Sequence, residues 1–208
     1  MLGVECYGGG LWHTWLDRDL GISGRVLVRT KSDDGKEMIQ QKFIKVNKPV
    51  ARVSSLCIHL KTVEERKSLT VNKETQMAPI LGTAGILQEG VKQQLSGQED
   101  YWKSKQDPYL LQLIAKELDI GVKDIADFEL NLFDTQPACL GGMRDEFLYS
   151  ARLDNQATCF VSIEGLIAHS NSEVFDTDTD ISMVCLFDHE EVGSGESFVL
   201  VSSVWSFV

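Results

Sequence analysis

The stretch Ile-Ser-Met-Val-Cys-Leu-Phe-Asp-His-Glu-Glu-Val-Gly-Ser, residues 181–194, carries the strongest indication of fold class in this chain. Residues 181–187 are nearly all apolar, and such a run ending in a Gly-Ser turn predicts a strand buried on both faces. Open α/β sheets bind ligands outside the carboxyl ends of their strands, where Glu190 and Glu191 lie. Adjacent acids are costly to keep ionised unless a cation or a proton shares their site. The stretch therefore indicates an α/β fold and metal-assisted hydrolysis.

A second stretch supports a functional role for Glu190 and Glu191. Without it, two adjacent glutamates after a strand are more typical of solvated charge in a loop. Residues 150–155, Ser-Ala-Arg-Leu-Asp-Asn, precede a segment with a helical pattern at 156–166. Asp154 at this junction has an ordinary interpretation as a helix N-cap. It is also well placed to bridge two cations. A strand–helix–strand unit would bring Asp154 and Glu191 to one sheet edge, so we expect the two carboxylates at one metal site.

Composition limits the classes of function. The 208 residues are 43% hydrophobic and 25% charged with a net charge of −11, as in an ordinary soluble protein without a basic patch, so nucleic-acid binding is not expected. No stretch reaches the roughly 18 apolar residues that span a membrane, and the first residues do not resemble a signal peptide. The five cysteines are scattered and odd in number. We expect buried, reduced thiols and a cytoplasmic location.

The pattern along the chain predicts a domain boundary near Gly141-Gly142. Predicted elements of the first domain are a hairpin of strands 25–29 and 42–46 turning at 32–35, helices over 74–95 and from Pro108 to Leu118, a polar loop over 98–106 and a strand over 128–133. A turn over 137–143 precedes the Asp154 region. Asp17-Arg18-Asp19 is interpreted as a structural ion-pair cluster.

Several motifs follow one another in the order and approximate spacing of a known family. They are Tyr-Gly-Gly-Gly-Leu-Trp (7–12), Trp-Leu-Asp-Arg-Asp-Leu (15–20), Ile-His-Leu (58–60), Asp-Thr-Gln-Pro-Ala (134–138), Arg-Leu-Asp-Asn (152–155) and Glu-Glu-Val-Gly-Ser (190–194). Together they resemble aspartyl aminopeptidase, a cytosolic-type dinuclear zinc metallopeptidase. The resemblance runs from Val4 to Ser194.

The resemblance implies a role for each matching residue. Asp154 would bridge two zinc ions, Glu191 would be a metal ligand, and Glu190 would be the general acid/base. His59 would project from a neighbouring subunit into the active site. The other histidines, His13, His169 and His189, match no ligand and are expected to be structural.

The resemblance also implies an assembly and a substrate. A catalytic α/β domain would be interrupted by a β-rich dimerisation domain with helices, and the subunits would form a homo-oligomer, a dodecamer in the family. Residues 1–140 would be the β-rich dimerisation-type domain, and residues 141–208 would be a partial α/β catalytic domain. The substrates would be peptides with N-terminal Asp or Glu. The family's upstream His-x-Asp segment and its C-terminal Asp and His ligands have no match here. We therefore expect part of a longer protein; the alternative is a catalytically inactive fragment that acts only as an oligomerisation module.

Overall fold

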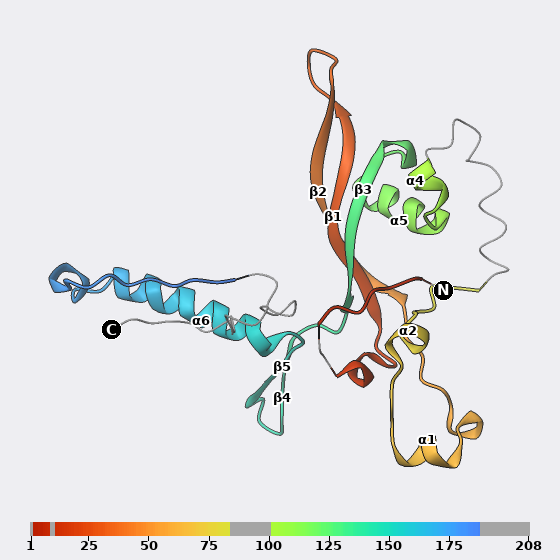
Figure 1. Cartoon of the computed structure of the whole chain (residues 1–208). Coiled ribbons are helices and arrows are strands. Elements are labelled where there is room, and N and C mark those ends of the chain that lie inside the picture. The colour runs from red at the N-terminus through yellow and green to blue at the C-terminus, as the bar shows by residue number, and fades with distance from the viewer. Residues whose placement is uncertain (1, 9–10, 84–100, 188–208) are drawn as a thin grey trace, which may run out of the picture. The chain divides into compact units, whose positions relative to one another are not determined.

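A computed structural model of the chain describes residues 2–8, 11–83 and 101–187 (Figure 1). The chain forms two compact units. The first combines Met1–Glu5 with Trp12–Thr135, and the second combines Cys6–Leu11 with Gln136–Val208. Helices and strands both occur in each unit, as expected for a mixed helix and sheet protein.

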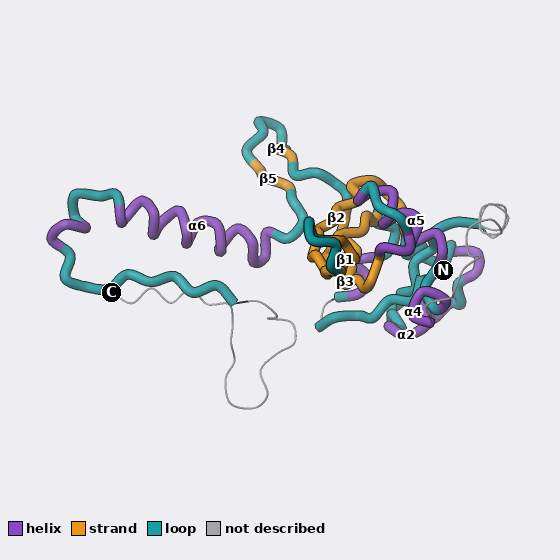
Figure 2. The backbone as a smooth tube through the Cα atoms, turned by 90° about the horizontal axis from the view of Figure 1, so that it is seen from above, coloured by secondary structure: helices purple, strands orange, loops and turns teal. Residues whose placement is uncertain are grey.

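An antiparallel sheet of three long strands organises the first unit (Figures 1 and 2). Strand β1 (Leu20–Lys31) lies between β2 (Glu37–Ala51) and β3 (Ile125–Asp134) and pairs with both. The turn between β1 and β2 closes where Gly35 N donates to Ser32 O at 2.8 Å, with Gly35 at φ +80. This geometry favours glycine. The predicted hairpin and the predicted strand over 128–133 are confirmed.

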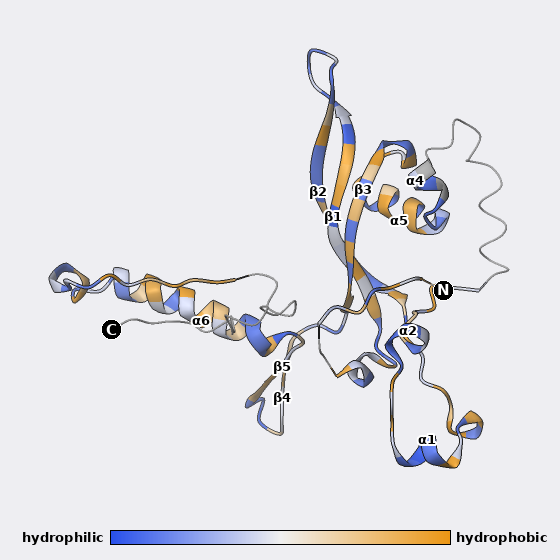
Figure 3. Ribbon diagram, viewed as in Figure 1, coloured by the Kyte–Doolittle hydropathy of each residue, from blue (hydrophilic) through white to orange (hydrophobic). Residues whose placement is uncertain are grey.

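The core of the first unit lies between the sheet and helix α5 (Pro108–Leu118). Asp107 caps this helix by accepting hydrogen bonds from Tyr109 N and Leu110 N, and Pro108 occupies its first turn, where a missing N–H costs nothing. The buried side chains of the cluster are Ile22, Val26, Val28, Ile44, Leu110, Leu111, Ile114, Ala115 and Ile125. Figure 3 shows the corresponding apolar colour along β1 and on α5. The predicted helix over 108–118 is confirmed.

Short elements complete the first unit: η1 (Trp12–Trp15), η2 (Ile58–Leu60), α1 (Val63–Lys67), α2 (Lys73–Gln76), α4 (Tyr101–Ser104) and η3 (Val122–Asp124). The predicted helix over 74–95 is wrong in its described part, because α2 ends at Gln76. Pro79 disfavours helical backbone at Ala78 and cannot donate to a helix ladder. Residues 84–95 lie outside the described residues. Helix α4 lies within the stretch that was expected to be a polar loop.

The second unit contains a short hairpin and a long helix. Strands β4 (Cys139–Gly141) and β5 (Phe147–Tyr149) pair antiparallel, and the turn between them includes Gly142 at φ +97. Helix α6 (Leu153–Ser170) includes the predicted helical segment 156–166, and η4 (Phe175–Thr177) follows it. Within the part of the chain that the structure describes, no helix is both long and apolar enough to span a bilayer.

The predicted buried strand over 181–187 is wrong. These residues have no regular secondary structure, and Ile181 is 86% exposed. Figure 3 shows this apolar segment beside α6. A strand needs neighbouring strands to pair with its N–H and C=O groups. The only strands among residues 136–187, β4 and β5, pair with each other, so the apolar pattern has no ladder to join.

The expectation of buried thiols is also wrong. All five cysteines are free, but Cys57 and Cys139 are exposed and Cys6, Cys159 and Cys185 are half-buried. Apolar neighbours in sequence do not bury a thiol when the segment itself lies at the surface.

Candidate metal centre and the arm that carries His59

Asp154 lies where the chain enters α6. Its backbone, with φ −84 and ψ 112, is not helical, and the peptide bond to Asn155 is cis. The N-cap position belongs to Arg152, whose side chain makes no cap hydrogen bond. The N-cap interpretation of Asp154 is therefore wrong, and its exposed carboxylate is available to a ligand.

The predicted partners of Asp154 fall in the segment after Phe187. Glu190 and Glu191, together with His189, lie outside the described residues, so the convergence of Asp154 and Glu191 stays a prediction. Among described residues, no group of three or more His, Cys, Asp or Glu side chains could hold a metal ion. A zinc site takes about four ligands, and a carboxylate oxygen is one accepted type. The donor chemistry of Asp154 fits zinc, but the described residues do not complete a site.

His59 lies in η2, within a long segment of the first unit that follows β2. We name residues 54–76 the arm; it begins after the buried Val53 and ends before the buried Met77. No residue of the arm is buried, and its apolar side chains are outward, with Ile58 61% and Leu60 69% exposed. The arm has local order of its own: Thr62 and Glu65 form a capping box at α1, with Thr62 N donating to Glu65 Oε2 at 2.8 Å.

A polar cluster ties the base of the arm to the sheet. Ser55 N donates to Asp17 Oδ1 at 3.1 Å, and Arg52 Nη2 donates to the backbone oxygen of Asp17 at 2.7 Å. Arg52 Nη1 also lies 3.4 Å from Asp19 Oδ1. Hydrogen bonding by Ser55 is the main reason that the pKa of the Asp17 carboxyl is lowered, with Arg52 and Lys61 adding smaller Coulombic attractions.

The expected ion pairing at Asp17-Arg18-Asp19 occurs with distant partners: Arg18 pairs with Asp134, and Asp19 pairs with Arg52. Sequence reasoning missed Arg52. This arginine stands far from the cluster along the chain, and only the pairing of β1 with β2 brings the two together. Local spacing contains no indication of it.

His169 has the structural role that was expected. Its Nε2 lies 3.0 Å from Asp178 Oδ2, and its ring meets Phe175 edge-on at a centroid distance of 5.7 Å. These contacts hold the segment after α6 against the C-terminal end of the helix.

The chain is similar to known proteins along its length. It matches the family model of aminopeptidase I zinc metalloprotease (M18) over residues 1–208. It is 41% identical over 210 residues to aspartyl aminopeptidase of Aspergillus oryzae, a match that covers 93% of this chain and 41% of that protein. The chain therefore spans less than half of that relative's length.

Solved structures agree in fold. In the cryo-EM structure of the Ape4 and Nbr1 complex, the matching chain is 34% identical with a TM-score of 0.68, covering 85% of this chain and 33% of that one. The mApe1 dodecamer of S. cerevisiae is 28% identical with a TM-score of 0.50, covering 80% of this chain and 32% of that one. The expected mixed helix and sheet fold, as a partial domain of this kind of peptidase, is confirmed. With the match of the family model to residues 1–208, these similarities show that the chain belongs to the aminopeptidase I zinc metalloprotease (M18) family.

Proposed function

We propose that this chain is part of a metallo-aminopeptidase that removes N-terminal Asp or Glu from peptides. The observation that carries the proposal is the 41% identity to an aspartyl aminopeptidase over 93% of the chain. The exposed carboxylate of Asp154, at a loop-to-helix junction and not engaged as a helix cap, agrees with a metal-binding role.

The proposed roles follow the chemistry of each side chain. Asp154 and Glu191 would hold two zinc ions through their carboxylates, with Asp154 shared between them. Bound zinc lowers the pKa of a coordinated water and polarises a carbonyl. Glu190 would act first as a general base, which accepts a proton from the attacking water, and then as a general acid, which gives that proton to the leaving amine. An acidic N-terminal residue is the proposed substrate preference.

The proposed enzyme is a cytoplasmic homo-oligomer in which His59 reaches the active site of a neighbouring copy. The arm supports this proposal, because none of its residues is buried and apolar residues such as Ile58 and Leu60 stay in water unless another surface covers them. A related protein, mApe1, is a dodecamer. The five free thiols agree with a reducing compartment.

Hydrolysis of an aspartyl anilide tests the proposal. Purified chain is assayed with and without added Zn²⁺, beside Glu190→Gln and the control Glu173→Gln, which changes an exposed glutamate in the same unit. Because the family's upstream His-x-Asp segment and its C-terminal ligands have no match in this chain, we expect little zinc-dependent turnover from the chain alone. Turnover that is present should persist in the control and fall about 100-fold or more in Glu190→Gln. Equal turnover in Glu190→Gln and the parent would contradict the assignment of the base. Absence of turnover in the parent would leave the inactive-fragment alternative in its place.

A further inference from the structure

Described hydrogen bonds fasten the arm to the rest of the first unit near its two ends. Between Val53 and Met77 no side chain is buried, so no hydrophobic packing fixes the position of η2 and α1. Where the arm returns, the backbone of Ile80 pairs with that of Arg52 through hydrogen bonds of 3.1 and 2.8 Å. Arg52, two residues before the arm, is thus bonded to Ile80, four residues after it.

Asp17 fastens the departing end. Its backbone N–H donates to Val53 O at 2.8 Å, and its carboxylate accepts from the N–H of Ser55 at 3.1 Å. The residue has φ 61, in the left-handed region, where Asp, Asn and Gly are the common occupants. In this conformation, Asp17 forms hydrogen bonds with both Val53 and Ser55, where the arm leaves the sheet.

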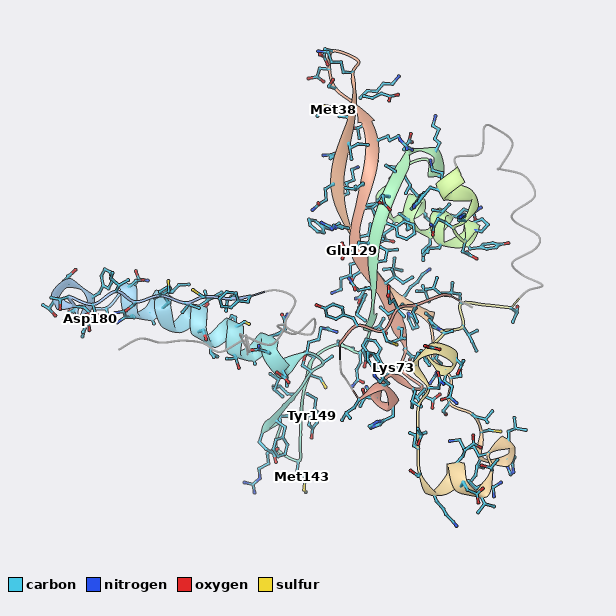
Figure 4. All side chains as sticks on the ribbon, in the orientation of Figure 1. Met38, Lys73, Glu129, Met143, Tyr149 and Asp180 are labelled. Atoms are coloured by element: carbon cyan, nitrogen blue, oxygen red, sulfur yellow. The ribbon has the colours of Figure 1, made fainter. Side chains whose placement is uncertain are left out.

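The Arg52 guanidinium joins this attachment to the sheet. It donates to the backbone oxygen of Asp17 and lies beside the carboxylate of Asp19, which directly precedes β1. Arg52 therefore links the two ends of the arm. Its backbone is hydrogen-bonded to Ile80 beyond the returning end, and its side chain is hydrogen-bonded to Asp17, which holds the departing end. In Figure 4, Lys73 marks the returning end of the arm, where its ammonium lies 5.5 Å from the centre of the Trp12 ring.

We propose that Asp17 and Arg52 are positioning residues that set where the arm presents His59. The inference rests on the proposed function, in which His59 acts at the site of a neighbouring copy. Neither side chain belongs to the apolar core, so their loss opens no cavity. What they fix is the direction in which an otherwise unpacked segment leaves the sheet.

Distance measurement between two spin labels tests the inference on the full chain. One label is attached to Cys57, which lies in the arm beside η2 and is exposed, and the other to a Gln41→Cys variant on the exposed side of β2. The remaining four cysteines are replaced by serine. We expect one narrow distance distribution in the parent, and a distribution about twofold broader in Asp17→Gly and in Arg52→Gln, because an arm without packing samples many directions once released.

Matched variants separate positioning from general loss of structure. Asp17→Gly keeps the left-handed turn but removes the acceptor, whereas Asp17→Asn keeps both, so the parent distribution should return in Asp17→Asn. Glu129→Gln removes an exposed sheet ion pair with Arg25 and should leave the distribution unchanged. Parent-like widths in Asp17→Gly and Arg52→Gln would overturn the inference. So would equal broadening in Glu129→Gln.

The proposed role of His59 is judged by a separate measurement. His59→Ala is compared with the parent in the aspartyl-anilide assay, and its distance distribution is expected to be unchanged. Full turnover in His59→Ala would contradict the catalytic role of the arm while leaving the distance result intact. A broader distance distribution in Asp17→Gly, with a lower kcat and an unchanged unfolding midpoint in the same variant, supports both the positioning role of Asp17 and the catalytic role of His59.

Discussion

Arg18 Nη1 lies 2.9 Å from Asp134 Oδ2, and this ion pair joins residues 116 positions apart at the start of β1 and the end of β3. The Asp134 side chain is 17% exposed, so water screens this pair less than it screens a fully exposed one. We expect a double-mutant cycle of Arg18→Ala and Asp134→Ala, measured by urea unfolding, to give a coupling free energy of about 1 kcal/mol.

The Arg25–Glu129 pair is the matched control. Its two side chains are 56% and 59% exposed on the same sheet, and its coupling should be about 0.3 kcal/mol. A coupling for Arg18 and Asp134 no larger than that of this control would mean that partial burial adds nothing to the pair.

At Gly24, the backbone of β1 approaches the backbone of β3 too closely for a side chain. A Cβ there would collide with the carbonyl oxygen of Glu129 and lie 2.9 Å from Leu130 Cα, and φ is +155. Gly24→Ala should lower the free energy of unfolding by about 2 kcal/mol or more, since backbone atoms cannot move aside cheaply. Gly3→Ala, where nothing lies within 4 Å, should change it by less than about 0.5 kcal/mol. Similar urea midpoints for both variants would contradict the strand pairing at Gly24.

Leu111 is 1% exposed between α5 and the sheet. Leu111→Ala leaves a cavity and should cost about 2–5 kcal/mol of unfolding free energy. Leu140→Ala is the control, because Leu140 in β4 is 66% exposed and its removal opens no cavity. Thermal or urea unfolding, followed by intrinsic fluorescence, measures both variants. A large loss of unfolding free energy in Leu140→Ala would contradict the exposed position of Leu140.

The attachment of the arm should depend on pH. The pKa of Asp17 is lowered in the folded protein, chiefly by hydrogen bonding from Ser55, so its contribution is complete above the ordinary aspartate pKa. That contribution is lost as the pH falls through the lowered value. We expect the mobility of the label on Cys57 to increase as the pH falls below about 4. Asp17→Asn, which keeps the acceptor without a titrating group, should abolish this step; an identical pH profile in that variant would assign the step to another group.

Zinc binding should depend on Asp154. Asp154→Asn keeps the size of the side chain but removes the charge that neutralises a cation, so the dissociation constant for Zn²⁺, measured by competition with a chelating dye, should rise about tenfold or more. Asp176→Asn, an exposed acid in η4, should leave it unchanged. Equal affinities in Asp154→Asn and the parent would remove Asp154 from the metal site.

Patterns that are satisfied within a short segment predicted the fold best. Asp107-Pro108 supplied both the cap and the first turn of α5, and the apolar spacing of that helix matched its buried face. The turn at Ser32–Gly35 predicted the β1–β2 hairpin for the same reason. Each of these depends on neighbouring residues alone.

Features that need a distant partner were not predictable from spacing. The apolar run 181–187 has the composition of a buried strand, but composition does not supply the strands it must pair with. Pro79 interrupts the helical period beyond Gln76, and the next residue, Ile80, forms a bridge with Arg52. Asp154 was correctly placed at a loop-to-helix junction from its sequence context, whereas the involvement of Arg52 with Asp17 arises only from tertiary pairing.

The confinement of the buried side chains to the first unit affects how the chain responds to heat. All buried apolar residues among those described lie between Leu20 and Ile125, and α6 contains none. Cooperative heat absorption and the heat-capacity step of unfolding both come from exposing apolar surface. Differential scanning calorimetry should therefore record the melting of the sheet and α5, while ellipticity from α6 declines gradually over a wide range of temperature. The two techniques will assign different melting temperatures to the same chain.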